Sequence, residues 1–152
     1  MIQTGEKLPS FSLSNQAGES RSNASYAGTW LVLYIYPKDD TPGCTIQGKS
    51  FSATKEDFAA ANAVPVGLSA DDVESHKAFC DKFAFTVELL ADPKAELLGA
   101  LGSGQSDYKG TAYWDRTTFL VDPGGVVKKV YEKVDPNGHE LTVLADLKTL
   151  QG

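Results

Sequence analysis

The sequence predicts an α/β fold in which helices flank a mixed central β-sheet. Strand-length apolar runs alternate with amphipathic, helix-length segments between residues 30 and 101. Two further apolar runs then flank a turn, which indicates that antiparallel strands join the sheet. No linker, repeat or shift in composition interrupts the 152 residues, so we expect one domain over residues 1–152.

The predicted strands are short apolar runs bounded by turn residues. Trp30–Tyr36 is almost continuously apolar, β-branched or aromatic and ends at Pro37, the pattern of a central strand buried on both faces. The other predicted strands are Phe11–Asn15 and Glu19–Arg21 as an N-terminal hairpin, Val64–Ser69, Glu88–Ala91, and Thr117–Val121 paired with Val126–Tyr131 across the turn Asp122–Gly125.

The first two predicted helices follow from periodicity and capping. Residues 44 to about 61 hold Phe51 and Phe58 seven positions apart among polar residues, which suits an amphipathic helix. Ser69 with Asp72 three positions later resembles a capping box, and it precedes a helical apolar face. The members of that face are Val73, His76, Phe79, Cys80 and Phe83.

Two shorter helices are predicted later in the chain. Asp92 can cap a helix that begins at Pro93 and runs to about Leu101. Asn137, with Glu140 three residues on, predicts the start of a last helix. The inward face of that helix would hold Val143, Leu144, Leu147 and Leu150.

Composition excludes several classes of function. The net charge is −6 and the 14 basic residues are scattered, which argues against nucleic acid as a partner. No stretch reaches the roughly 18 apolar residues of a membrane span, and the N-terminus has no signal-peptide pattern. Two cysteines and two histidines supply neither a disulfide scaffold nor a four-ligand zinc site. We therefore expect a cytoplasmic protein without a membrane partner, metal or bound cofactor.

Cys44 is the strongest candidate for chemistry because it lies between a predicted strand and a predicted helix. Unpaired backbone amides at a helix start stabilise the thiolate, which is the nucleophilic form of cysteine. Thr41, three residues earlier, could donate a hydroxyl hydrogen bond to the thiol or to a substrate oxygen. Asp39 and Asp40 would oppose the thiolate unless they point into water. The residues alone leave open that Cys44 is a small buried hydrophobe.

The residues around Cys44 resemble the sequence motif of a known protein family. Pro37, Thr41 and Cys44 match the Pro-x-x-x-Thr-x-x-Cys signature, so the chain resembles the peroxiredoxins. The segment Tyr36–Thr45 is similar to the bacterioferritin-comigratory-protein, or peroxiredoxin Q, branch. Further matches follow in family order at Val66–Asp71, Ser75–Lys77, Leu89–Pro93 and Arg116–Pro123, so the resemblance covers nearly the whole chain.

The resemblance implies a thioredoxin-like fold with an N-terminal extension and the reduction of hydroperoxides without metal or bound cofactor. Cys44 would be the peroxidatic residue, with Thr41 and Arg116 as polar partners and Pro37 as the shield of the pocket. The physical role of Arg116 would be to stabilise a thiolate and to hold peroxide oxygens with its planar fork. Thioredoxin or a glutaredoxin-type protein would be the reductant, and the branch implies a monomer.

One position departs from the pattern of this branch. Many members carry a resolving cysteine five positions after the peroxidatic one, where this chain has Lys49. The resemblance to a subset of the branch makes Cys80 the resolving cysteine. The alternative is that Cys80 belongs to the core beside Phe79 and Phe83, which would leave a one-cysteine peroxidase.

Other interpretations stay open at this point. A thioredoxin-type disulfide exchanger shares the expected fold, but Gln47 stands where its second cysteine would be. A binding or holdase protein is a non-enzymatic alternative. Taken alone, Arg116 beside Asp115 is typical of a surface ion pair, and His76 of a structural histidine. Among the aromatic residues, only Tyr36 is expected beside the pocket.

Overall fold

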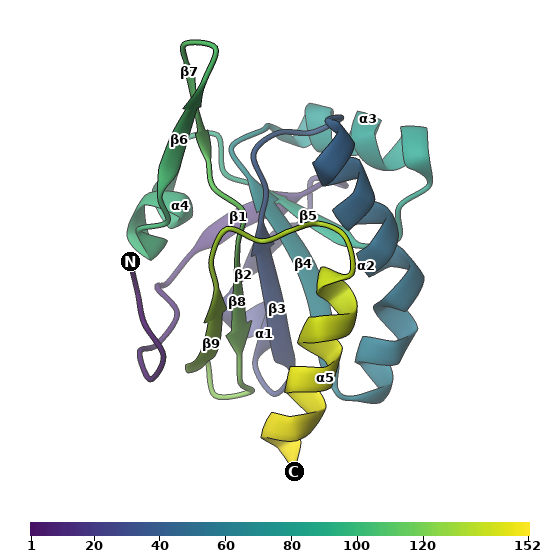
Figure 1. The fold of residues 1–152 in the computed structure, drawn as a ribbon, viewed down its shortest axis with the longest axis vertical. Helices are drawn as coiled ribbons and strands as arrows, with labels where there is room; N and C mark the ends of the chain where they lie inside the picture. The colour runs from purple at the N-terminus through teal and green to yellow at the C-terminus, as the bar shows by residue number, and fades with distance from the viewer.

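The computed structural model describes residues 1–152 and contains a seven-stranded mixed sheet with helices on both faces (Figure 1). The strand order is β2-β1-β5-β4-β3-β8-β9, in which β3, β4 and β5 run parallel and the other neighbours pair antiparallel. These strands are β1 (Ser12–Asn15), β2 (Ser20–Ser22), β3 (Trp30–Ile35), β4 (Ala63–Ser69), β5 (Glu88–Ala91), β8 (Thr117–Val121) and β9 (Val127–Tyr131). The predicted mixed sheet and N-terminal hairpin are confirmed.

The helices cover both faces of the sheet, so the core forms two layers with the sheet between them. They are α1 (Asn23–Tyr26), α2 (Pro42–Ala60), α3 (Val73–Phe83), α4 (Glu96–Leu101) and α5 (His139–Gln151). Side chains of α2, α3 and α5 form one apolar cluster, and those of α4 and α1 join the other. No helix of the structure is both long enough and apolar enough to cross a membrane.

The central strand β3 contributes to both clusters, as its apolar run predicted. Val32 and Tyr34 face α2 and α5, whereas Leu31, Leu33 and Ile35 face α4. All five are at most 2% exposed, so β3 is buried on both faces. The strand leads directly into the loop before α2, and this loop is therefore anchored in the centre of the sheet.

The helix boundaries correct two of the capping predictions. The capping box predicted for Ser69 and Asp72 is wrong, because Asp72 is itself the N-cap of α3 and accepts from the Ser75 amide. Asn137 does not cap α5, whose N-cap is Gly138 in the left-handed region at φ 77°. The side chain of Asn137 instead bonds to Asp135.

The start of α4 is a further correction. This helix begins at Glu96 rather than Pro93, since Ala95 adopts a left-handed conformation at φ 54° and interrupts the backbone. Asp92 still satisfies the amides of the first turn, as predicted. Its two carboxylate oxygens accept from the amides of Glu96 and Leu98 at 2.9 and 2.8 Å.

The sequence interpretation missed a hairpin between α4 and β8. Strands β6 (Gln105–Tyr108) and β7 (Thr111–Trp114) pair only with each other and project from the body of the molecule (Figure 1). All four residues of β6 are exposed, so the hairpin lacks the alternation of apolar and polar residues that reveals a half-buried strand. It stands beside the end of the sheet where α2 begins (Figure 1).

Gly48 in α2 yields a prediction about packing. A Cβ at this position would overlap the Phe85 ring, whereas a Cβ at Gly99 in α4 would contact nothing within 4 Å. Gly48→Ala should therefore lower the free energy of unfolding by up to about 2 kcal/mol, because over-packing outweighs the helix propensity gained. The matched Gly99→Ala should raise it by about 0.5–1 kcal/mol. Urea denaturation of both variants checks the pair, and stabilisation by Gly48→Ala would contradict it.

Candidate active site

Cys44 lies in the first turn of α2, two residues further into the helix than predicted. Thr41 is the N-cap and Pro42 the first helical residue, whose missing N–H costs nothing at that position. The first-turn amides lack carbonyl partners within the helix and stabilise negative charge there. The Cys44 side chain is only 2% exposed. A thiolate at this site therefore depends on the protein, rather than on water, for its stabilisation.

The sheet brings Arg116 beside Cys44, although the two residues are 72 positions apart in the sequence. Strands β3 and β8 pair antiparallel with Ile35 opposite Thr117, so the residue before β8 lies beside the loop after β3. One terminal nitrogen of Arg116, Nη2, donates to Cys44 Sγ at 3.4 Å. Arg116 makes no ion pair with Asp115, which instead accepts a hydrogen bond from Ser106. The surface ion-pair alternative for Arg116 is wrong.

Gln47 is a site residue that the sequence interpretation did not recognise. It lies one helical turn after Cys44, and its Oε1 accepts from Arg116 Nη1 at 2.7 Å. Its side chain is 1% exposed and its Nε2 has no hydrogen-bond partner. Gln47 thus orients the guanidinium while Nη2 faces the thiol. The available signal was a polar residue at a helical position that should be buried.

Gly43 makes room for this arrangement. A Cβ at residue 43 would overlap the guanidinium of Arg116, so any larger residue would force Arg116 away from its present position. The glycine in the Thr-Pro-Gly-Cys segment is therefore explained by the close approach of an arginine side chain rather than by a left-handed backbone.

Thr41 and Pro37 lie around the thiol without bonding to it. The Thr41 hydroxyl donates to the Lys38 carbonyl at 2.9 Å, and the Thr41 carbonyl accepts from the amide of Thr45. Thr41 therefore stabilises the loop in this structure rather than donating to Cys44. Both Pro37 and Thr41 line a pocket of about 670 Å³ next to the thiol.

The outer wall of this pocket comes from the β6–β7 hairpin. The loop and Arg116 form its floor, together with Pro42 and Gly43. The wall is lined by Ser106, Tyr108, Tyr113 and Trp114, with Asp115, Lys133 and Val134 beside them. Tyr36, the aromatic residue predicted beside the pocket, is instead 1% exposed and does not line it. Its hydroxyl donates to Asp39 at 2.6 Å.

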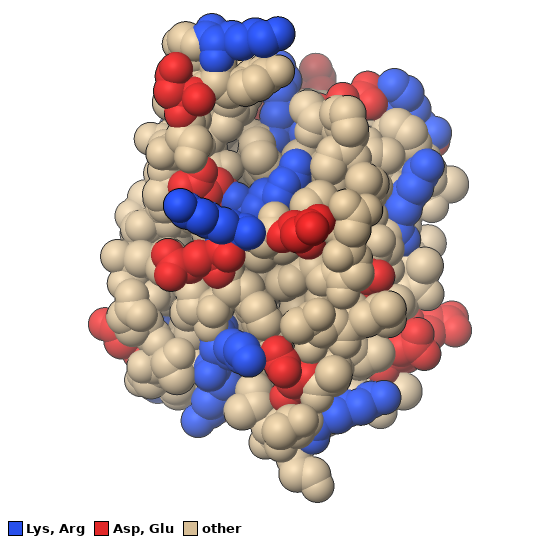
Figure 2. Space-filling model, in the orientation of Figure 1, with Lys and Arg blue, Asp and Glu red and all other residues tan.

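The two aspartates near the thiol are both compensated by basic groups. Asp40 is exposed and pairs with Lys82 at 2.8 Å. Asp39 is buried, and its carboxylate lies 2.7 Å from His76 Nδ1. Each carboxylate thus has a side-chain hydrogen-bond or ion-pair partner. On the face shown in Figure 2, acidic and basic side chains are interspersed without a continuous patch of one sign.

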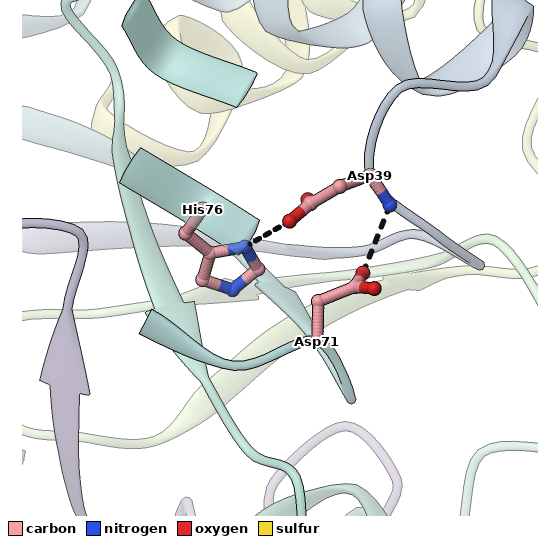
Figure 3. Close-up of side chains that lie close together, drawn as sticks. All are labelled: Asp39, Asp71 and His76. Carbon is pink, nitrogen blue, oxygen red and sulfur yellow. Dashed lines mark hydrogen bonds and ion pairs between the residues drawn. The ribbon is translucent and has the colours of Figure 1, made fainter. Parts of the chain in front are cut away.

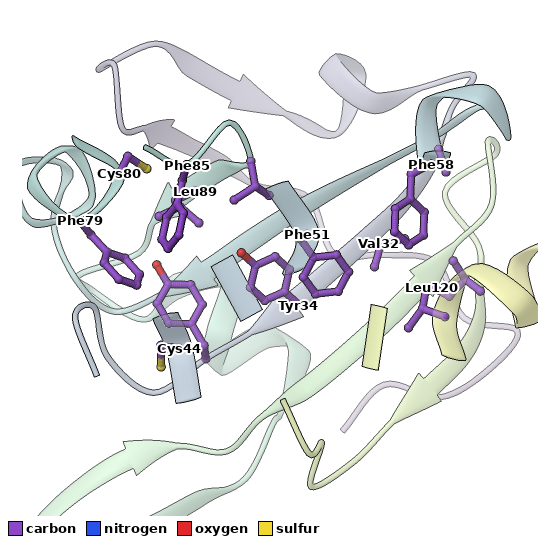
Figure 4. Close-up of a cluster of buried hydrophobic side chains, with 14 of the residues drawn as sticks. Val32, Tyr34, Cys44, Phe51, Phe58, Phe79, Cys80, Phe85, Leu89 and Leu120 are labelled. Atoms are coloured by element: carbon purple, nitrogen blue, oxygen red, sulfur yellow. The ribbon is translucent and has the colours of Figure 1, made fainter. Parts of the chain in front are cut away.

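The second thiol lies at the start of the last turn of α3 and is 7% exposed. Both cysteines are free and belong to the same apolar cluster (Figure 4). They come from separate helices, and in this view the Phe79 ring lies between them. Burial raises the pKa of the Cys80 thiol to about 12, with smaller contributions from the negative charges of Asp39 and Asp81. Burial therefore favours the protonated form of Cys80 in this structure.

The class of protein that this fold and thiol pocket define is a thiol-dependent oxidoreductase. Comparison with known proteins specifies it further. The model of the AhpC/TSA family matches residues 4–130. The chain is 40% identical over 139 residues to the peroxiredoxin Bcp of Xanthomonas campestris pv. campestris, covering 90% of this chain and 87% of that protein. It is 37% identical to the chloroplastic peroxiredoxin Q of Populus jackii, covering 98% of this chain and 70% of that protein.

Solved structures give the same result. The structure of PrxQ from Xylella fastidiosa superimposes with a TM-score of 0.94 and 31% identity, covering 100% of this chain and 99% of that one. The bacterioferritin comigratory protein of Xanthomonas campestris gives a TM-score of 0.87 and 36% identity, covering 93% and 92%. The chain therefore belongs to the AhpC/TSA family and is a peroxiredoxin, an enzyme that reduces peroxides with a thiol. The predicted thioredoxin-like fold and thiol peroxidase activity are confirmed.

The raised pKa of Cys80 predicts a distinctive alkylation profile. In an unfolded chain the alkylation rate levels off above the ordinary thiol pKa, by about pH 10. In folded, reduced Cys44→Ser, the rate at Cys80 should be lower and still rising at about pH 10, because the folded thiol keeps its proton. Mass spectrometry of iodoacetamide-treated samples measures the rate, with the urea-unfolded variant as control. Equal profiles for the folded and unfolded variant would contradict the prediction.

Proposed function

We propose that Cys44 is the peroxidatic residue and that this enzyme reduces both hydrogen peroxide and organic hydroperoxides. The observation that carries the proposal is the 3.4 Å hydrogen bond from Arg116 to the Cys44 sulfur beside an open pocket. A guanidinium at that distance favours the thiolate and has a further N–H available for a peroxide oxygen. The related bacterioferritin comigratory protein of Xanthomonas campestris has alkyl peroxide reduction activity, and the 670 Å³ pocket of this chain has room for an organic group.

The proposed first step is a nucleophilic displacement at oxygen. The Cys44 thiolate attacks one peroxide oxygen, an S–O bond forms and the O–O bond breaks. The departing hydroxide or alkoxide takes up a proton and leaves as water or alcohol. Arg116 faces the developing negative charge, and Gln47 holds Arg116 in position. Cys44 becomes a sulfenic acid, which is reversible on the cysteine oxidation ladder.

The proposed second step joins Cys44 to Cys80 within one chain. Once it leaves the core, the Cys80 thiol loses its proton and its sulfur attacks the sulfenic sulfur. The S–S bond forms, the S–O bond breaks, and the departing hydroxide takes up that proton and leaves as water. Thioredoxin or a glutaredoxin-type dithiol then reduces the disulfide and restores both thiols. Because both cysteines are in the same chain, the cycle requires no second subunit, and we propose a monomer. The cycle also depends on a reducing compartment, which favours the cytoplasm.

The two proposed cysteine roles predict different behaviour for the two serine variants. Cys44→Ser should lose peroxidase turnover entirely, because the attacking atom is gone. Cys80→Ser should consume one equivalent of peroxide and then stop, and further peroxide should drive Cys44 towards sulfinic acid. Free-thiol counts and intact mass after stoichiometric peroxide measure both outcomes, and a coupled thioredoxin assay measures turnover.

Further outcomes of the same experiment distinguish the proposed cycle from its alternatives. Peroxide-treated wild type should remain a monomer on a non-reducing gel, as an intramolecular disulfide requires. A first oxygen found on Cys80, or a disulfide-linked dimer as the main product, would refute the assignment. Insulin reduction without peroxide turnover would instead favour the disulfide exchanger, and inert thiols the binding protein.

Arg116 provides a separate test through the geometry of its donors. Arg116→Lys keeps the positive charge but loses the two-pronged contact with Gln47 and Cys44. We expect the rate of Cys44 oxidation to fall by about tenfold or more while thermal stability changes little. Arg21→Lys, in the distant pair with Glu88, is the matched control and should react at the wild-type rate. A wild-type rate in Arg116→Lys would remove Arg116 from the active site.

A further inference from the structure

A buried polar cluster links the loop before the helix that carries Cys44 to the helix that carries Cys80. Asp39 belongs to the loop before α2, and Ser75 and His76 belong to the first turns of α3. Figure 3 shows Asp39 and His76 facing each other, with the Asp71 carboxylate bonded to the backbone nitrogen of Asp39. His76 is 0% exposed and Asp39 is 7% exposed. The cluster lies outside the pocket, and the proposed chemistry uses none of its members.

Hydrogen-bond geometry fixes the protons of this cluster. His76 Nε2 lies 2.8 Å from the carbonyl oxygen of Leu90, which can only accept, so Nε2 carries a proton. His76 Nδ1 lies 2.7 Å from Asp39 Oδ2, and one more proton lies between those two atoms. Asp39 also accepts from the hydroxyls of Tyr36 and Ser75 at 2.6 and 2.8 Å. Asp39 is thus surrounded by three donors.

The hydrogen bonds already made by these carboxylates also explain why the cluster is not a metal site. Asp39, Asp71 and His76 have potential ligand atoms within 4.8 Å of one another. The Asp39 oxygens, however, already accept from side-chain donors, and Asp71 Oδ2 accepts from the Asp39 amide and the Ser69 hydroxyl. A cation would have to displace these donors. The polar atoms serve to connect the loop to the helix.

Disulfide formation requires the two connected elements to move. A disulfide needs its Cα atoms within about 4.4–6.8 Å, whereas the thiols are free and buried in separate helices. Cys80 lies one helical turn after His76, and Cys44 lies five residues after Asp39. The last turn of α3 ends at Ala84 in a left-handed conformation at φ 54°, an unfavourable position for a residue other than glycine. Local unfolding of this last turn would release that strain, at the cost of the hydrogen bonds from the Ala84 and Phe85 amides to the Cys80 carbonyl.

We propose that the hydrogen bonds of Asp39 to Ser75 and His76, here called the Asp39–His76 clamp, hold the reduced enzyme closed and limit the rate of disulfide formation. This proposal rests on the proposed role of Cys80 as the resolving cysteine. The clamp holds the pocket loop in its reactive shape and keeps α3 folded, so it favours the peroxide reaction and opposes the approach of Cys80. Asp39 and His76 are positioning residues in this scheme, because neither contacts Cys44 or the peroxide.

Two neighbouring aspartates allow a matched test. Asp39→Asn removes the charge that holds the clamp, and Asp40→Asn makes the same change in the exposed pair with Lys82. We expect disulfide formation in Asp39→Asn to be about tenfold faster or more, because a buried hydrogen bond to a charged group is lost. The fraction of sulfinic acid under excess peroxide should fall, and the first oxidation of Cys44 should be equal or slower. Asp40→Asn should stay within about twofold of wild type on all measures.

Further variants separate the clamp from a general loss of stability. Ser75→Ala removes a single donor to Asp39 and should accelerate disulfide formation by a smaller factor, which keeps the test decisive if Asp39→Asn folds poorly. Leu98→Ala removes a fully buried side chain on the opposite face of the sheet. It should lower thermal stability without accelerating the disulfide. Hydrogen exchange of the reduced proteins should show loss of protection over residues 76–84 in Asp39→Asn and, to a smaller extent, in Ser75→Ala, but not in Leu98→Ala.

The measurements are stopped-flow rates at limiting peroxide and mass spectra at excess peroxide. Unchanged or slower disulfide formation in both Asp39→Asn and Ser75→Ala would overturn the clamp while leaving Cys80 as the resolving residue. Equal acceleration in Leu98→Ala would also overturn it, because instability alone would then be the cause. A wild-type enzyme that forms no Cys44–Cys80 disulfide would instead overturn the proposed function, and the clamp with it.

Discussion

A buried sulfur can carry negative charge only where the protein supplies the stabilisation that water would otherwise give. Cys44 is almost inaccessible to solvent, so this stabilisation comes from two sources, the first-turn amides of α2 and the guanidinium of Arg116. The antiparallel pairing of β3 with β8 brings these two sources together, because it sets Ile35 opposite Thr117. The register of the central sheet thus determines the chemistry. Gly43 and Gln47 then fix the approach and the orientation of the arginine.

The same fold must meet a second requirement that conflicts with the first. Under the proposed mechanism, peroxide reduction favours a loop and helix held rigidly around the Cys44 thiol, whereas disulfide formation with Cys80 requires α3 or the loop to move. A purely apolar contact between these elements would give stability without a fixed geometry. Buried ionic pairs add little net stability, but breaking one partner is costly and their geometry is specific. Asp39 and His76 therefore suit a contact whose purpose is position rather than stability.

Features that depend on residues close together in the sequence were predictable, whereas contacts between residues far apart in the sequence were not. Strand Trp30–Tyr36 and the hairpin after Thr117 were predictable because burial leaves a local apolar pattern. Cys44 was predictable because a strand, a loop and a helix start are contiguous in the sequence. The contact of Arg116 with Gln47 joins residues 69 positions apart, and only the resemblance pointed to Arg116. Nothing in the local sequence could have revealed that His76 faces Asp39.

The starts of α4 and α5 were predicted wrongly for a different reason. Capping depends on the backbone angles of one or two residues, and Ala95 and Gly138 adopt left-handed conformations that composition alone does not specify. The β6–β7 hairpin shows no alternation of apolar and polar residues, since its strands pair only with each other and most of its residues are exposed. Both errors concern segments whose conformation depends on their tertiary surroundings or on their own pairing, rather than on the burial of an apolar face.

The independence of that hairpin has an evolutionary consequence. Its two strands bond only to each other, yet Tyr108, Tyr113 and Trp114 line the pocket above the reactive thiol. Trp114 also packs against the apolar core, but substitutions at the exposed Tyr108 and at Tyr113 can alter the shape and polarity of the pocket entrance without changing the pairing of the seven-stranded sheet. The floor of the pocket, in contrast, includes Gly43 and Arg116, which determine how the guanidinium meets Cys44. Selection can therefore diversify the recognition of substrates in one segment of ten residues, Gln105 to Trp114, while the reaction centre is inherited unchanged.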